Sequence, residues 1–161
     1  MIANNRTGAI ISALITLVIY VGIPYIAPSY LSPETMAMAT EYGFDLPSLF
    51  NQMMIIGVVT AALTLIKGFV DETSVISLLV TIGQNLSSLI FMVILLGAGN
   101  IMSMGLTEFT VDQQGVTSTI VMDLRVFIYF TFGTIGLKVI QSFLEWTEVR
   151  KDAAPPGRIP A

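Results

Sequence analysis

The sequence predicts an all-α integral membrane protein with four transmembrane helices, a short outer helix and an outer hairpin or loop. Three observations lead to this fold class. Hydrophobic residues make up 54% of the 161 residues and charged residues only 11%, whereas soluble domains carry about 25% charged residues. The mean hydropathy is +0.81. Four apolar stretches each reach the roughly 20 residues that a helix needs to cross the hydrocarbon core of a bilayer.

The first predicted span covers residues 8–27, with the sequence GAIISALITLVIYVGIPYIA. A cleaved signal peptide is the alternative for an apolar segment this close to the N-terminus. We expect the segment to be retained as a span for two reasons. It is longer than a typical signal-peptide core, and Ala27, the small residue at its end, precedes Pro28.

A short outer helix is predicted after the first span, where the sequence reads SPET. Ser32 suits the N-cap of this helix, Pro33 suits its first position and Glu34 suits its first turn. The second span follows at residues 47–70.

The third span is predicted at residues 74–102 and the fourth at residues 124–149, with Asp123 as a candidate N-cap. The link VDETS is a tight turn, so the second and third spans are expected to be antiparallel neighbours. The segment LTEFTVDQQGVTSTI has Thr and Val on both sides of DQQG, which favours an outer β-hairpin or an extended loop. Residues 1–149 therefore form a single four-helix transmembrane domain, and the Pro-rich residues 150–161 form a disordered cytoplasmic tail.

The distribution of charge predicts the orientation in the membrane. Cationic residues fall at the N-terminus, in the turn between the second and third spans, and at the C-terminus, namely Arg6, Lys67, Arg150, Lys151 and Arg158. The loops on the other side carry carboxylates, namely Glu34, Glu41, Asp45, Glu108 and Asp112. The positive-inside rule then places both termini in the cytoplasm of a multi-pass protein of the cell membrane.

The composition also excludes several kinds of chemistry. The chain contains no Cys and no His, which removes disulfides, thiolate and imidazole metal sites, and catalysis by either residue. No pair of carboxylates lies within the spans at a catalytic spacing, so we expect no enzyme activity, no metal and no cofactor. A net charge of −4 without a basic run excludes nucleic acid as an expected partner.

Polar residues form stripes inside the third and fourth spans. Their spacing of three and four residues keeps each stripe on one helix face. With a rise of about 1.5 Å per residue, Lys138, Gln84 and Asn85 share a level roughly 13–15 Å into the membrane. The candidate pathway or buried polar layer consists of Ser77, Thr81, Gln84, Asn85, Ser88, Thr131, Thr134, Lys138, Gln141 and Glu145.

Two interpretations of these stripes are open. Ser and Thr bond back to their own helix and polar side chains join transmembrane helices, so the stripes can be packing contacts. Alternatively, they line a water-filled path. Lys138 likewise has a structural interpretation. It either forms an ion pair with Asp71, Glu72 or Glu145, or extends its ammonium group to the membrane interface. Its functional reading is a position in a permeation or binding path.

Two functions follow from these interpretations. The first is a channel or passive transport pore, assembled as a homo-oligomer because four helices leave little room for a path within one subunit. The second is a non-catalytic structural subunit of a larger membrane complex, with the stripes buried against partner helices. In both cases the chain's partners are the lipid bilayer and other membrane-embedded subunits, either copies of itself or other chains.

Overall fold

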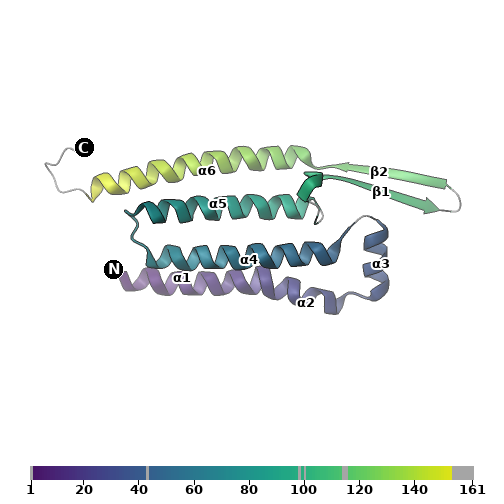
Figure 1. Ribbon diagram of the computed structural model, residues 1–161, viewed down its shortest axis with the longest axis horizontal. Helices are drawn as coiled ribbons and strands as arrows, with labels where there is room; N and C mark the ends of the chain where they lie inside the picture. Colours follow the sequence, from purple (N-terminus) through teal and green to yellow (C-terminus); the bar gives the residue numbers. More distant parts are fainter. Residues whose placement is uncertain (1, 43, 98, 100, 114–115, 154–161) are drawn as a thin grey trace.

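The computed structural model consists mainly of helices that run side by side (Figure 1). It describes residues 2–42, 44–97, 99, 101–113 and 116–153. Among these residues, four helical segments are long and apolar enough to cross a membrane, namely Arg6–Tyr30, Leu46–Phe69, Val75–Leu96 and Arg125–Asp152.

The first of these segments is a helix with a wider turn inside it. Helix α1 (Ile2–Leu17) continues into a π-helical turn (Val18–Gly22) and then into α2 (Ile23–Tyr30). Pro24, in the first turn of α2, explains the change. A proline has no N–H to donate, and its ring clashes with the carbonyl four residues earlier in a regular α-helix. The π turn changes the hydrogen-bonding pattern just before this proline, and the helix continues past it.

A short helix precedes the second long one. Helix α3 (Pro33–Glu41) begins at Ser32, whose hydroxyl accepts a hydrogen bond from the Thr35 N–H at 3.1 Å. Helix α4 (Leu46–Phe69) begins in the same way, because the Asp45 carboxylate accepts from the Ser48 N–H at 3.0 Å. These caps satisfy N–H groups that have no partner within the helix.

Helix α5 (Val75–Leu96) ends earlier than the predicted boundary at residue 102. Gly97 closes the helix, and Gly99 has a φ of +88°, a conformation that side chains other than hydrogen rarely adopt. A Cβ on Gly99 would lie 3.0 Å from the Asp45 carbonyl oxygen at the start of α4. The glycine-rich sequence thus turns the chain against α4, and a short 3₁₀ turn, Ile101–Ser103, follows.

Two antiparallel strands project beyond the helices at the end opposite the N-terminus (Figure 1). Strand β1 (Leu106–Gln113) pairs with β2 (Val116–Asp123), from Leu106 opposite Asp123 to Gln113 opposite Val116. Residues 114 and 115 between the strands lie outside the described residues. Gly105, with a φ of +84°, leads into β1.

Helix α6 (Arg125–Asp152) begins one residue later than the sequence suggested, since Leu124 rather than Asp123 is its N-cap. Asp123 still contributes, because its carboxylate accepts a hydrogen bond from the Arg125 backbone N–H at 3.0 Å. The helix extends past the predicted end at residue 149. The predicted disordered tail falls mostly on residues 154–161, which lie outside the described residues.

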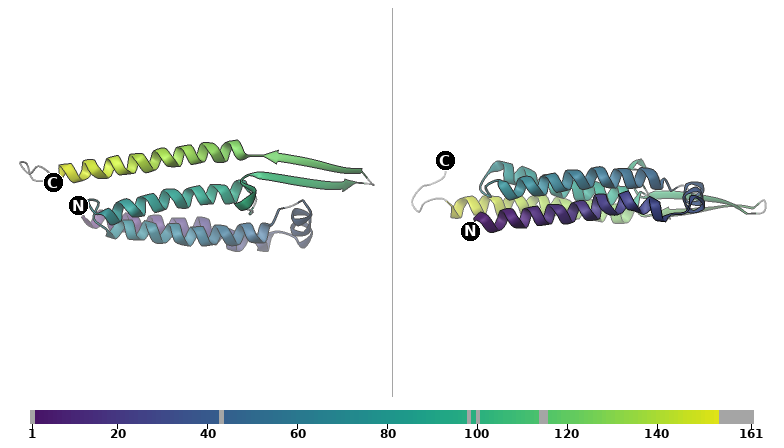
Figure 2. Two further views of the ribbon diagram at one scale, coloured as in Figure 1. Left: turned by 45° about the horizontal axis from the view of Figure 1, so that its top comes forward. Right: turned by 90° about the horizontal axis from the view of Figure 1, so that it is seen from below.

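The four long helices pack as an open row in the order α1, α4, α5 and α6, each mainly against its neighbours. Figure 1 and the left view of Figure 2 place α6 at the edge of the row, beside α5. Many large apolar side chains on the outside are exposed, for example Val18 at 64%, Leu79 at 61% and Leu137 at 70%. Apolar surface of this extent suits contact with lipid and is unusual for a soluble monomer.

Helix α4 and the first span approach closely at Gly57 of α4, which is buried. A Cβ on Gly57 would lie 2.5 Å from the Tyr20 Cβ and 3.1 Å from the Tyr20 carbonyl oxygen. Gly57 and Ala61, one turn apart and both buried, form the small-residue pair that lets these backbones approach. The Tyr20 ring continues across to Phe91 of α5, with a centroid separation of 4.7 Å.

We predict that Gly57→Ala lowers the free energy of unfolding by about 1–3 kcal/mol, because the added methyl group must push the π turn away from α4. Gly136→Ala is the matched control, since a Cβ at Gly136 meets nothing within 4 Å and alanine favours a helix. Thermal melts of both variants in detergent, followed by circular dichroism, measure the difference. Equal melting temperatures for the two variants would show that this contact does not hold the helices together.

We also predict a pH dependence at the start of α6. The Arg125 side chain donates hydrogen bonds to Asp123 at 2.6 Å and 2.9 Å and lowers the pKa of that carboxyl from 3.8 to about 2. Because this pKa is lower in the folded state, the pair contributes stability above about pH 4 and loses it as the pH falls towards 2. NMR titration of Asp123 should give a midpoint near 2, which rises towards 3.8 in Arg125→Met. An unchanged midpoint in the variant would contradict the pairing.

Candidate functional site

Two polar residues of α5 face α4 and bond to it. The hydroxyl of Ser87, only 4% exposed, shares a hydrogen bond with the hydroxyl of Thr60. One turn further along the same face of α4, the Gln84 side-chain N–H₂ donates to the Thr64 hydroxyl at 3.0 Å. Both threonines also donate to a carbonyl of their own helix, at 2.8 Å in each case. These side chains therefore join α4 to α5 and have their hydrogen bonds within the chain.

Two other contacts join α5 to α6. The side-chain N–H₂ of Asn85 lies 3.4 Å from the Ser142 hydroxyl oxygen, which accepts from it. At the end of the row that carries the N-terminus, the indole N–H of Trp146 donates to the Thr73 and Ser74 carbonyls at 3.2 Å and 3.1 Å. The polar pattern of the sequence does not single out Ser142 or the bond made by Trp146. Both lie off the polar stripe of the fourth span, and only the position of α5 reveals their role.

Several predicted residues bond to their own helix. Each hydroxyl donates to the carbonyl four residues earlier, at 2.8–3.1 Å, as Ser and Thr commonly do in transmembrane helices. These residues are Thr81, Ser88, Thr131 and Thr134. The carbonyl of Ser77 accepts the hydrogen bond from Thr81, and the Ser77 residue is buried, with 7% of its surface exposed. The hydroxyl donors of Thr81, Ser88, Thr131 and Thr134 are therefore already used.

Lys138 lies on an exposed face of α6. No carboxylate among the described residues lies within ion-pair distance of its ammonium group. The ion pair considered with Asp71, Glu72 or Glu145 is thus not formed in the described chain. Glu145 instead accepts a hydrogen bond from the Gln141 side chain at 2.7 Å, one turn along the same face.

The structure divides the predicted polar layer into two parts. Of the α5 residues in this layer, Gln84 and Asn85 bond to neighbouring helices. The α6 residues Thr134, Lys138, Gln141 and Glu145 are exposed, while Ile128 and Ile135 of the same helix are buried against the rest of the chain. We call these four exposed residues the α6 stripe.

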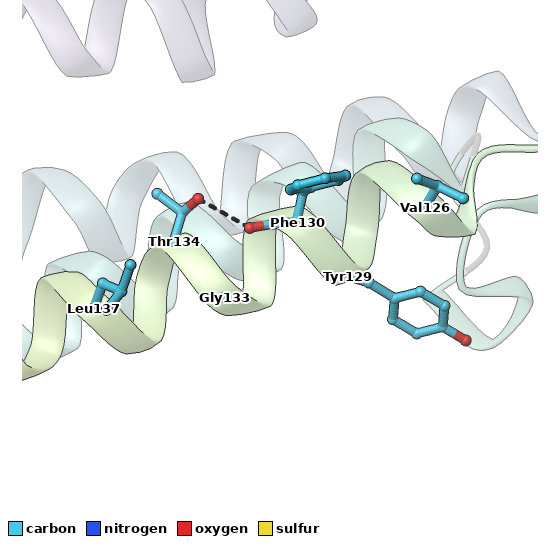
Figure 3. Close-up of a pocket in the computed structure, with 6 residues that line it drawn as sticks. All are labelled: Val126, Tyr129, Phe130, Gly133, Thr134 and Leu137. Atoms are coloured by element: carbon cyan, nitrogen blue, oxygen red, sulfur yellow. Dashed lines mark hydrogen bonds between the residues drawn. The ribbon is translucent and has the colours of Figure 1, made fainter.

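A shallow apolar hollow of 620 Å³ lies beside the α6 stripe (Figure 3). It is lined by Val126, Tyr129, Phe130, Gly133, Thr134 and Leu137, all on α6. In Figure 3 the Thr134 hydroxyl is directed at the Phe130 carbonyl, with which it bonds at 2.9 Å. A Cβ on Gly133 would meet nothing within 4 Å. This glycine therefore opens the helix surface without serving any contact in the described chain.

The residues that the structure describes contain no group of three or more Asp or Glu side chains placed to hold a metal ion. Chemically, the site offers hydrogen-bonding groups and one unpaired ammonium on a single exposed helix face.

We predict that Thr60 and Ser87 are energetically coupled. In a double-mutant cycle with Thr60→Val and Ser87→Ala, the coupling free energy should be at least about 0.6 kcal/mol, the average measured for such bonds in membranes, and at most about 1.7 kcal/mol, the largest value measured. Unfolding in mixed detergent micelles provides the free energies. Thr131→Val replaces Thr60→Val in the control cycle, because Thr131 bonds only to Phe127 of its own helix. That pair should be additive to within about 0.5 kcal/mol, and similar coupling in both cycles would contradict the assignment.

No family model, no curated protein and no solved structure matches the chain. A function for this chain therefore rests on the chemistry and geometry of its own residues.

Proposed function

We propose that the chain forms a homo-oligomeric membrane channel or passive transport pore, with the α6 stripe of each copy facing a shared water-filled path. The observation that carries the proposal is the exposed α6 stripe, with Lys138 midway along a helix of 28 residues. Of the α5 residues predicted to share this path, Gln84 and Asn85 bond to neighbouring helices, and Thr81 and Ser88 bond to their own helix. We therefore place the lining on α6 alone, which is narrower than the sequence suggested.

The cost of exposing Lys138 to lipid supports this proposal. Lys138 lies about 20 Å from either end of α6, and a lysine stem spans only several ångströms towards the interface. A lysine at the centre of a transmembrane helix costs about 2.5–3.5 kcal/mol on insertion scales. In the described chain neither a carboxylate nor a neighbouring helix offsets this cost. In the proposed assembly, water or another subunit at this face offsets the cost.

The open row of helices supports a path between copies. A row does not enclose a channel, and α6 at its edge packs mainly on α5. The rest of α6 is free to meet another copy, and Gly133 in the adjacent hollow permits a close approach of a second helix. In a closed ring, one Lys138 from each copy would form a ring of positive charge, a feature of pores that favour anions.

We also propose the orientation that the charges predict. Arg6, Lys67, Arg150 and Lys151 belong to the end that carries the N-terminus, which is then cytoplasmic. Helix α3 and the β1–β2 hairpin lie at the opposite end (Figure 1), which is then outside the cell membrane.

A structural subunit of a larger membrane complex is the second candidate, and the hairpin favours it. Two strands alone are marginally stable in water, yet β1 and β2 extend beyond the helices (Figure 2). Ile120, Val121 and Met122 on β2 are exposed at 57%, 56% and 44%. A different partner chain that covers these residues would hold the hairpin and use the α6 stripe as a contact.

The mass of the protein expressed alone in detergent separates these two functions. We expect a discrete closed oligomer, whereas a monomer would favour the structural subunit. In liposomes that contain the oligomer, Lys138→Met should lower anion permeability relative to cation permeability several-fold, because it removes the positive charge from the path. Lys151→Met, the same substitution at the end of α6, should leave the ratio unchanged. An unchanged ratio in Lys138→Met would remove Lys138 from the path.

A further inference from the structure

A second cavity, of 240 Å³, lies between α1 and α4 near the N-terminus. Its lining differs from the apolar hollow on α6, because it combines small residues, hydroxyl groups and both signs of charge. It is formed by Gly8, Ala9, Ser12, Thr64, Lys67, Gly68 and Glu72. Glu72 comes from the turn that links α4 to α5, so three segments of the chain meet here.

Small residues keep the cavity open. A Cβ on Gly8 would meet nothing within 4 Å, whereas Gly57 further along α4 is in close contact with the first span. The two helices therefore touch at Gly57 and leave space at Gly8. The Arg6 guanidinium lies 5.7 Å from the centre of the Phe69 ring and ties the ends of α1 and α4 together. The walls of the cavity are thus positioned before any ligand binds.

The polar groups of the cavity differ in their capacity for new bonds. The Thr64 hydroxyl donates to Thr60 and accepts from Gln84, so it is engaged within the chain. Lys67 is an exposed side chain with three donors. Glu72 already interacts within the chain, and a carboxylate offers about four acceptor sites in all. Lys67 and Ser12 therefore suit an anionic group, and Glu72 suits a cationic one.

We propose that this cavity binds a small zwitterion that carries a phosphate and a primary ammonium group, as a phosphoethanolamine headgroup does. The phosphate binds Lys67 and Ser12, and the ammonium donates to Glu72. The volume of 240 Å³ lies below the roughly 300–1,000 Å³ of pockets for drug-sized ligands, which matches a headgroup alone. Charged pockets between transmembrane helices are a known setting for lipid headgroups.

The surroundings of the cavity favour a lipid over a soluble source. Ile11, Ile66 and Phe69 adjoin lining residues in the sequence and are exposed at 52%, 45% and 57%. Hydrocarbon chains attached to a bound headgroup would lie along this apolar surface, which continues on α1. Lys67 is in the last turn of α4, at the level of a membrane interface.

Native mass spectrometry of the full chain, released from mixed micelles, tests the proposal. The probes are phosphatidylethanolamine, phosphatidylglycerol, which lacks the ammonium, and phosphatidylcholine, whose quaternary ammonium cannot donate a hydrogen bond. We expect preferential retention of phosphatidylethanolamine. Lys67→Met and Glu72→Gln should each weaken its binding about tenfold, the effect of one charge-assisted hydrogen bond. Lys151→Met is the control for the loss of a lysine at the same end and should retain the lipid.

Gly8→Leu provides a second test, because it fills the cavity without removing a charge and its Cβ has open space. We expect this variant to keep its helix content and to lose the lipid. Soluble glycerophosphoethanolamine that binds as tightly as the lipid would support the zwitterion site and assign it a soluble ligand. Equal retention of phosphatidylglycerol and phosphatidylethanolamine, or full retention by folded Lys67→Met and Gly8→Leu, would overturn the proposal.

Discussion

Hydrocarbon offers no hydrogen bonds, and this absence governs how the polar side chains of the four long helices are arranged. Ser87 and Gln84 of α5 meet the constraint by bonding to Thr60 and Thr64 of α4. The close contact at Gly57 instead joins α4 to the first span at Tyr20, so backbone packing holds one neighbour of α4 and hydrogen bonds hold the other. Lys138 has no such partner in the described chain. The same constraint therefore explains both the packing of the row and the proposal of a wet or protein-covered face on α6.

The polar groups in this arrangement are separated by role. Residues between α4 and α5 serve packing, the α6 stripe offers an unpaired ammonium midway along α6, and the cavity between α1 and α4 presents both charges near one end. Thr64 belongs to the first set and also lines the cavity, whereas the α6 stripe shares no residue with the cavity. A path between copies along α6 and a lipid in the α1–α4 cavity can therefore exist together, since neither uses the residues of the other.

The long helices were predictable because apolar length alone identifies them, and the structure bears out four helices long and apolar enough to span a membrane. The end of α5 was not predictable from the sequence, because only the contact of Gly99 with α4 shows why the chain turns after Leu96. Periodicity identifies residues that share one face of a helix, but it does not say which helix lies opposite. For that reason Gln84 and Lys138, expected in one layer, lie in different surroundings. The roles of Ser142 and Trp146 likewise needed the position of α5.

The central claim is that water reaches the α6 stripe within an assembly, and cysteine labelling measures this most directly because the chain has no cysteine of its own. Lys138→Cys and Leu137→Cys place thiols at nearly the same depth on two exposed faces of α6. A charged, water-soluble thiol reagent reacts with the thiolate, which forms only in contact with water. In liposomes, we expect the reagent to modify the thiol at position 138 rapidly and the thiol at position 137 very little. Equally slow modification at both positions would contradict it.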